Sequence, residues 1–196
     1  MKKHHFTLCF KEPLLGCTPK NQDIYKQYIM TRAALDDEQI AEEMNSVESM
    51  EEKGWTGFHQ DEAGIFLFDY VIKGFLKDAC GTLRRAKGTE SMTLKAYKKV
   101  IDGLVFITPR KIRLELPEGG EIGVIERPLR TSGPTGDRVA LARSDTCPVG
   151  TKITFDLTIL GEVSEKLQTE WFDYGALRGL GQWRNAGYGS FTYELS

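Results

Sequence analysis

GLGQWRNAGYGSF, residues 179–191, places four glycines, a tryptophan, a tyrosine and an arginine within thirteen positions late in the chain. The glycines do not follow the G-x-G-x-x-G or G-x-x-x-x-G-K-[ST] spacing of nucleotide-binding loops. A helical pattern precedes the stretch and a strand pattern follows it, so it lacks the helix N-terminus that binds phosphate in those loops. We therefore expect Gly187 and Gly189 to allow a sharp turn and close packing against a sheet.

The rest of the chain alternates between strand and helix periodicity. The strand candidates are residues 5–10, 104–109, 110–116, 120–129, 138–144, 151–160 and 188–195. The helix candidates are residues 23–35, the later part of 64–86, 93–103 and 163–180. RTSGPTGD, residues 130–137, is a flexible loop by composition. This order is the β-α-β-β-α-β plan with additions, so we predict an α+β, ferredoxin-like (RNA-recognition-type) antiparallel sheet with helices on one face.

Length and composition indicate one domain. The 196 residues, 40% of them hydrophobic, are enough for one core, and we predict a single domain over 1–196 with residues 36–63 as an inserted acidic lobe. No apolar run approaches the about 18 residues of a membrane span, so we expect a cytoplasmic protein with no membrane partner. The four cysteines form no C-x-x-C pair, and we expect reduced thiols, no metal site and no cofactor.

The net charge of −2 hides a separation of charge along the chain. Between Asp36 and Glu62 ten acidic residues accompany the single base Lys53, whereas between Lys73 and Arg113 eleven Lys or Arg accompany three acids. A basic face of this size can bind a polyanion. Such runs are also common on solvated surfaces, so charge alone does not decide the partner.

Signals of catalysis are weak. The chain contains no G-x-S-x-G, H-E-x-x-H or P-loop motif. His5 and His59 offer general acid or base groups, but neither has a partner that the sequence identifies. We therefore predict no catalytic residue, and a processing ribonuclease remains an alternative.

The candidate nucleic-acid contacts are basic and aromatic residues near the ends of helices and strands. Lys73 and Lys77 lie four residues apart and share a helix face that can contact successive phosphates. Trp183 and Tyr188 offer stacking rings to a single strand, and Arg184 offers a cation. The predicted contacts are Lys73, Lys77, Arg84, Arg127, Arg130, Arg138, Arg143, Trp183 and Arg184.

Three segments, taken in order, resemble the RAMP superfamily, the repeat-associated proteins of CRISPR systems. GLGQWRNAGYGSF resembles the glycine-rich loop of that superfamily. VIKGFLKDACGTLR, residues 71–84, resembles the helix of the backbone subunits that carries Lys-Gly and a basic residue three positions later, here Lys73, Gly74 and Lys77. Residues 125–160 resemble the strand, variable loop and strand pair of the same subunits, with Arg127 before the loop and a Pro-x-Gly-Thr turn after it.

The resemblance implies a ferredoxin-like fold that binds single-stranded guide RNA in antiviral defence, with CRISPR-complex subunits or like copies of itself as partners. FDYV, residues 68–71, replaces the serine-rich entry to the Lys-Gly helix, and the acidic lobe is a second departure. Our first hypothesis is a non-catalytic RNA-binding subunit. The second is an interaction protein, including a phage-borne inhibitor that imitates a subunit, acting through residues 36–62. The third is a repeat-RNA-processing endoribonuclease.

Overall fold

A computed structural model of the chain describes residues 2–26, 38–39, 41, 54–133, 136–161 and 163–196, with only the backbone between 129 and 140. Its centre is a four-stranded antiparallel sheet in the order β12-β1-β11-β7. The strands are β1 (Lys2–Phe10), β7 (Val105–Thr108), β11 (Lys152–Ile159) and β12 (Phe191–Leu195). Helices α3 (Asp69–Leu83) and α5 (Glu165–Arg178) separate them in the chain, so the ferredoxin-like α+β prediction is confirmed.

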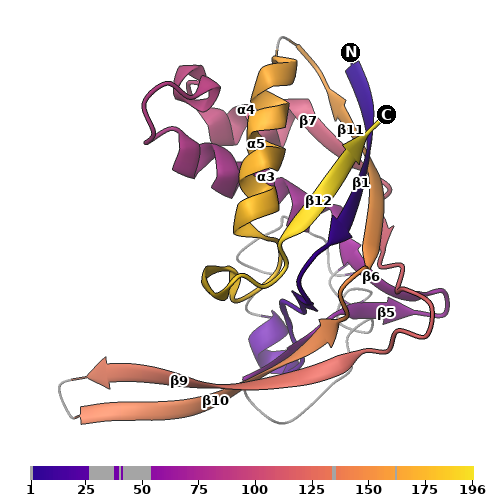
Figure 1. Cartoon of the computed structure of the whole chain (residues 1–196), viewed down its shortest axis with the longest axis vertical. Helices are drawn as coiled ribbons and strands as arrows, with labels where there is room; N and C mark the ends of the chain where they lie inside the picture. The colour runs from indigo at the N-terminus through magenta and orange to yellow at the C-terminus, as the bar shows by residue number, and fades with distance from the viewer. Residues whose placement is uncertain (1, 27–37, 40, 42–53, 134–135, 162) are drawn as a thin grey trace.

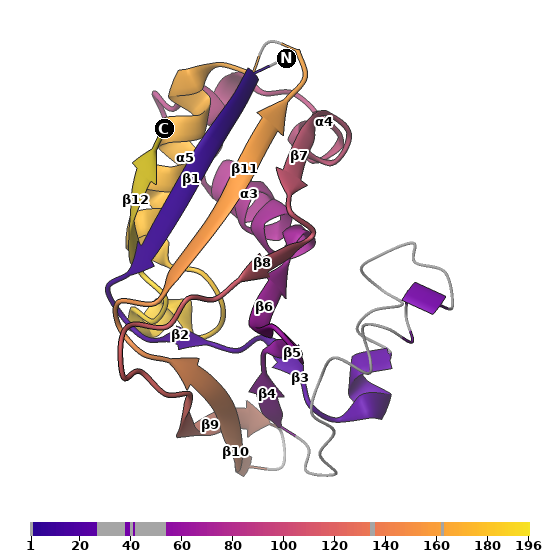
Figure 2. The ribbon, with the colours of Figure 1, turned by 90° about the vertical axis from the view of Figure 1, so that its right-hand side faces the viewer.

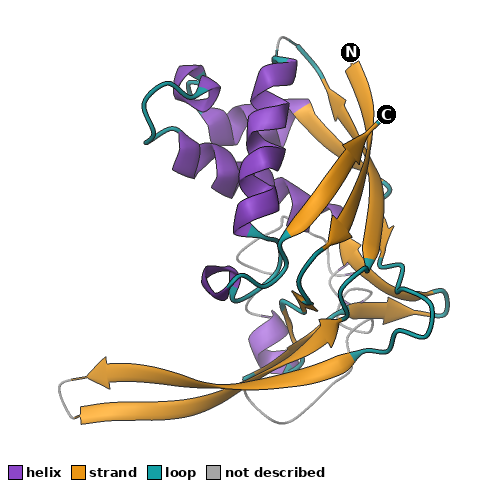
Figure 3. Cartoon of the chain, in the orientation of Figure 1, coloured by secondary structure: helices purple, strands orange, loops and turns teal. Residues whose placement is uncertain are grey.

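The helices cover one face of this sheet (Figures 1 and 3). Strand alternation explains this arrangement, because Phe6, Leu8 and Phe10 of β1 are all buried whereas Thr7 between them is not. Phe6 stacks on Phe172 of α5 with ring centroids 4.1 Å apart. Burying each such aromatic ring stabilises the fold by about 1.5–3 kcal/mol. The core therefore lies between the sheet and the helix layer.

Local signals position α5 in that layer. The Ser164 hydroxyl caps the first turn by accepting the Leu167 N–H at 3.2 Å, and Glu165 and Arg178 suit the two ends of the helix dipole. Trp171 is fully buried and donates its indole N–H to the Ser91 hydroxyl at 3.1 Å. Two further elements complete the helix layer, η1 (Glu90–Thr93) and α4 (Tyr97–Leu104).

Two smaller sheets extend the structure below the central one (Figure 2). One contains β2 (Leu14–Leu15), β3 (Thr18–Pro19), β4 (Trp55–Gly57), β9 (Gly123–Gly133) and β10 (Gly136–Cys147). The other contains β5 (His59–Asp61), β6 (Gly64–Phe68) and β8 (Lys111–Arg113). In Figure 1, β9 and β10 leave the rest of the chain as a two-stranded arm.

This arm corrects one prediction, since residues 130–133 and 136–137 of the expected flexible loop 130–137 belong to strands, and 134–135 lie outside the described residues. Arg130 pairs with Val139, and Gly133 pairs with Gly136, so β9 extends to Gly133 and β10 begins at Gly136. The polar, glycine-containing composition is typical of a loop, but the backbone N–H and C=O groups of the paired residues find their partners across the two strands. Composition alone does not reveal that pairing.

Most of the predicted acidic lobe, residues 36–63, falls outside the described residues. Its last part, from residue 54, forms β4 and β5 and so belongs to the two smaller sheets. The helix predicted for residues 23–35 is present over residues 22–26, and its remainder is also outside the description. None of the described helices is both long and apolar enough to cross a membrane.

Candidate nucleic-acid interface

The glycine-rich loop connects α5 to β12 and packs closely on its own first residues. The Leu180 N–H donates to the Gly189 carbonyl oxygen at 3.0 Å, and the Gly189 N–H donates to the Pro13 carbonyl oxygen at 3.0 Å. A β-carbon at Gly189 would overlap the Leu180 carbonyl oxygen, whereas one at Gly187 would meet nothing within 4 Å. Both residues have positive φ, +89° and +71° for Gly187 and Gly189. Gly187 is therefore required for the backbone conformation of the turn, and Gly189 for both that conformation and the close contact with Leu180.

Aromatic residues of this loop form a stack with a cation. The Trp183 and Tyr188 rings are 5.2 Å apart and nearly parallel, at 5°. The Arg127 guanidinium, from β9, lies 4.7 Å from the centre of the Trp183 ring. Trp183 remains 38% exposed. Stacking on an arginine and on exposed aromatic rings is how proteins hold unpaired bases.

Arg127 is a buried cation with neutral partners. The residue is only 6% exposed, and its guanidinium donates to the Ser144 hydroxyl at 3.2 Å and to the Gln182 side-chain oxygen at 2.8 Å. The Arg127 Nε has no hydrogen-bond partner, and none of the carboxylates among the described residues forms an ion pair with the guanidinium. Burial lowers the pKa of Arg127, because desolvation penalises the charged form. An uncompensated buried charge of this kind attracts an anion.

A cavity of about 360 Å³ lies beside the loop, between it and α3. Its lining includes Tyr70, Gly74 and Asp78 of α3 and Gly181, Gln182 and Arg184 of the loop. Arg184 does not face outward as an unpaired cation, since it binds Asp78 at 2.8 Å. Gln182 belongs to the cavity and also accepts from Arg127, so the cavity and the buried arginine adjoin.

The two predicted lysines of α3 lie on a neighbouring side of that helix. Lys73 donates to the Asp102 carbonyl oxygen at 3.2 Å and lies 5.3 Å from the centre of the Phe106 ring. Lys77 pairs with the Asp102 carboxylate at 2.8 Å. The expected shared face is present, but it contacts α4 and β7, and neither lysine lines the cavity.

The other predicted contacts are dispersed. Arg84 lies over the Tyr97 ring, 5.1 Å from its centre, at the end of α3. Arg143 pairs with Glu126 across the arm at 2.5 Å. Arg130 belongs to β9 and Arg138 to β10, and the structure describes only the backbone of these two residues.

Of the seven predicted residues whose side chains the structure describes, three meet at the loop, Arg127, Trp183 and Arg184, and the other four lie elsewhere. The sequence did not identify two residues that organise this site, Ser144 and Gln182. Ser144 lies diagonally across the arm from Arg127, since Arg127 pairs with Ala142. Recognising the hairpin from the sequence would have placed Ser144 there.

The histidines lie elsewhere. His59 is 2% exposed, its ring stacks on Phe66 with centroids 5.5 Å apart, and its Nε2 is 3.2 Å from the Tyr25 hydroxyl. Burial lowers the pKa of His59 to about 3, so the ring is neutral near pH 7. His5 bonds to Asp156 at 2.8 Å on the sheet face away from the helices. Neither ring lines the cavity.

Comparisons with protein-family models and with curated protein sequences give no match. Solved structures do match. A chain of a Type IV-B CRISPR complex aligns with a TM-score of 0.50 and 11% identity, over 100% of this chain and 90% of that one. A chain of the Type III-B Cmr-beta complex bound to cognate target RNA aligns with a TM-score of 0.50 and 12% identity, over 98% of this chain and 60% of that one. The chain thus has a fold that also occurs in subunits of CRISPR complexes.

Proposed function

We propose that this chain is a non-catalytic protein that binds single-stranded RNA as a subunit of a CRISPR ribonucleoprotein, or in imitation of one. The observation that carries the proposal is Arg127, a buried cation without a described carboxylate partner, stacked on the exposed Trp183 of the glycine-rich loop. The similar folds supply the setting, because both come from CRISPR complexes and one of these is bound to target RNA.

In this proposal a phosphate of the strand approaches Arg127 and supplies the missing negative charge, while a neighbouring base stacks on Trp183. Gly74 lets the strand pass close to α3, because it has no side chain and is exposed. Lys73 and Lys77 assist as exchangeable cations, since a phosphate can replace the Asp102 contacts that now hold them. Arg184 contributes less charge, because Asp78 already neutralises it.

The open face of the central sheet is a weaker candidate for the RNA site. Its central positions carry Thr7, Thr154 and Asp156 rather than the aromatic pair that RNA-recognition sheets use. Asp156 is also anionic there, since bonds from His5 and Lys3 keep its pKa below the usual value. These features favour the glycine-rich loop.

The test compares two arginines that differ in their counter-ion. Arg113 already binds both carboxylate oxygens of Asp61, whereas Arg127 has no carboxylate partner among the described residues. Fluorescence anisotropy with a labelled single-stranded RNA should show affinity that falls with salt, with a slope of about −0.7 per neutralised phosphate. Arg127→Met should weaken binding and make the slope shallower by about 0.7, while Arg113→Met should bind as the wild type does.

Thermal unfolding separates this role from a structural one. Arg127→Met relieves the desolvation of a buried charge but also removes hydrogen bonds to Ser144 and Gln182, so the melting temperature should change little and the variant should stay folded at the assay temperature. Absence of RNA binding at low salt, or wild-type affinity and slope in Arg127→Met, would contradict the proposal.

Two other hypotheses have less support. The ribonuclease hypothesis relied on His59 and His5, and the former is enclosed in an aromatic cluster. The interaction hypothesis relied on residues 36–62, which fall mostly outside the description, so it stays a prediction. Replacing the acids of that segment by Gln and Asn and measuring recovery of CRISPR-complex subunits or further copies would test it.

A further inference from the structure

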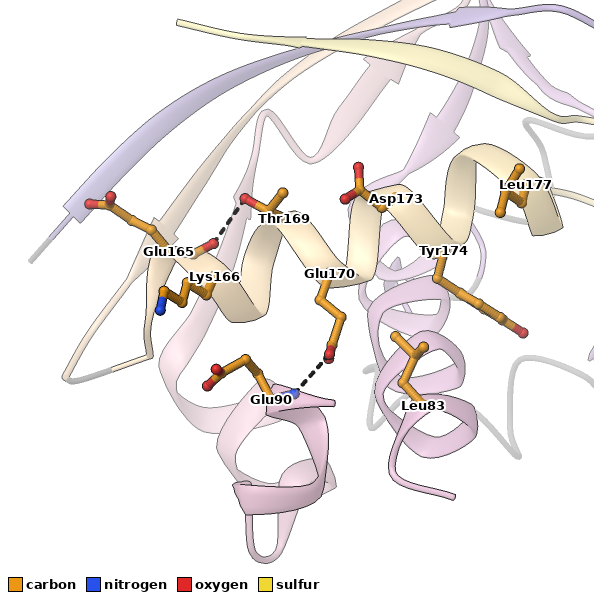
Figure 4. Close-up of a pocket in the computed structure, with 9 residues that line it drawn as sticks. All are labelled: Leu83, Glu90, Glu165, Lys166, Thr169, Glu170, Asp173, Tyr174 and Leu177. Carbon is orange, nitrogen blue, oxygen red and sulfur yellow. Dashed lines mark hydrogen bonds between the residues drawn. The ribbon is translucent and has the colours of Figure 1, made fainter. Parts of the chain in front are cut away.

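A groove of about 620 Å³ follows the solvent side of α5 (Figure 4). The end of α3 and the short η1 form its other wall, through Leu83 and Glu90. The residues that α5 contributes run from Glu165 to Leu177, nearly the full helix. At 1.5 Å per residue this is about 18 Å of groove. It shares no lining residue with the cavity beside the glycine-rich loop.

The floor of the groove is apolar. Figure 4 shows Tyr174 of α5 and Leu83 of α3 extending into the space between the two helices. Leu177 is 81% exposed, an unusual state for a leucine on a helix whose other side packs in the core. An isolated exposed leucine needs no explanation, but one that continues an apolar groove indicates a contact surface.

The rim of the groove is acidic. Four carboxylates line it, those of Glu90, Glu165, Glu170 and Asp173, and one ammonium, that of Lys166. Lys2 pairs with Glu165 at 2.8 Å, and the Tyr193 hydroxyl donates to Asp173 at 2.7 Å. The Glu170 carboxylate accepts the backbone N–H of Glu90 at 2.8 Å, which fixes η1 against α5. The hydrogen bond thus fixes one wall of the groove against α5, and the four carboxylates outnumber the two ammonium groups of Lys2 and Lys166.

We infer that this groove binds a basic amphipathic helix of another protein. The negative rim repels the phosphates of RNA and attracts Lys and Arg side chains. A groove about 18 Å long matches about twelve helical residues, enough for apolar anchors at i, i+3 or i+4, and i+7. Leu83, Tyr174 and Leu177 would contact those anchors, and Glu90 and Asp173 the flanking cations. This inference does not depend on RNA binding.

The probe is a labelled fourteen-residue helical peptide with leucines at the anchor spacing and lysines beside them, and its control carries Glu in place of each Lys. The whole chain should bind the Lys peptide saturably and at least tenfold more tightly than the Glu peptide. Leu177→Asp should weaken binding of the Lys peptide at least tenfold, as should Glu90→Lys combined with Asp173→Lys. Leu141→Asp, at a leucine 59% exposed on β10, should bind as the wild type does.

Several outcomes would overturn the inference. One is equal binding of the two peptides, and another is wild-type binding by Leu177→Asp with its circular dichroism intact. Light scattering that shows a dimer lost in Leu177→Asp would identify a second copy as the occupant instead. A photoreactive residue at position 177 that crosslinks to single-stranded RNA would assign the groove to nucleic acid. Because Leu177→Asp leaves the Arg127 site intact, its RNA affinity should stay unchanged, which separates this test from that of the proposed function.

Discussion

The two glycines near the end of the glycine-rich loop should respond very differently to the same substitution. Gly187→Ala places a methyl group in open space, so the substitution causes no steric overlap. Its destabilisation comes from holding an alanine in the left-handed conformation, at a φ of +89°, which costs about 1–2 kcal/mol of folding free energy. A smaller gain of about 0.4–1 kcal/mol from a stiffer unfolded chain offsets part of it. We expect Gly187→Ala to lower the free energy of unfolding by about 1 kcal/mol.

Gly189→Ala carries the same backbone cost and also a steric one. Its methyl group overlaps the Leu180 carbonyl oxygen, with the Leu180 carbonyl carbon only 3.0 Å away. Relieving that overlap moves two backbone hydrogen bonds, Leu180 N–H to Gly189 and Gly189 N–H to Pro13. Each bond contributes about 1 kcal/mol, and a buried group left without a partner costs about 1–3 kcal/mol. We expect Gly189→Ala to lower the free energy of unfolding by about 3 kcal/mol or more.

Urea denaturation followed by circular dichroism measures both values. The m-value should stay constant, since neither change alters the surface exposed on unfolding. Equal losses in the two variants would refute the reasoning, because they would show that conformation alone, without close packing at Leu180, explains the glycines.

Two further predictions concern buried ionisable groups. Because His59 has a folded pKa of about 3 and an unfolded pKa near 6.5, the unfolded chain binds more protons between these values, and stability falls as the pH falls through that range. This loss of unfolding free energy is at most about 1.4 kcal/mol per pH unit. In denaturation curves measured from pH 7 to pH 4, His59→Phe should therefore lose less stability than the wild type. Identical pH profiles of the two proteins would contradict this prediction. Lys20 and Asp145 form a pair at 2.8 Å with side chains only 5% and 13% exposed. Lys20→Met should cost about 3–5 kcal/mol, because it leaves the Asp145 carboxylate without this counter-ion, although the Trp55 indole N–H still donates to it. Adding Asp145→Asn should restore part of that stability, and no recovery would argue against a charge effect.

The central fold could be predicted from the sequence because its strands and helices carry strong periodicity. Residues 5–10 alternate between buried and more exposed positions, as expected for a strand. Residues 163–180 have the spacing of apolar residues and the N-terminal cap of an amphipathic helix. Each local pattern therefore agrees with the element that the structure contains. The glycine pattern predicted the turn and packing role that Gly189 has. Residues 130–133 and 136–137 could not be predicted as strands, because they are strands through backbone pairing between β9 and β10, which local composition does not report.

The candidate site was less predictable, because it depends on contacts between distant segments. Lys73 and Lys77 share a helix face as expected, but Asp102 of α4 holds both. Arg127 differs from the other arginines whose side chains are described through its burial and its neutral partners Ser144 and Gln182, and no local pattern in the sequence reports either property. Charge counting therefore identified a basic region without ranking its members.

Ultraviolet crosslinking of the intact protein to single-stranded RNA, with the modified residues identified by mass spectrometry, tests the central claim most directly. The proposed site predicts crosslinks at Trp183 or Tyr188, lost or strongly reduced in Arg127→Met. Crosslinks confined to the open face of the sheet, around His5 and Thr154, or to the α5 groove, around Tyr174, would contradict it.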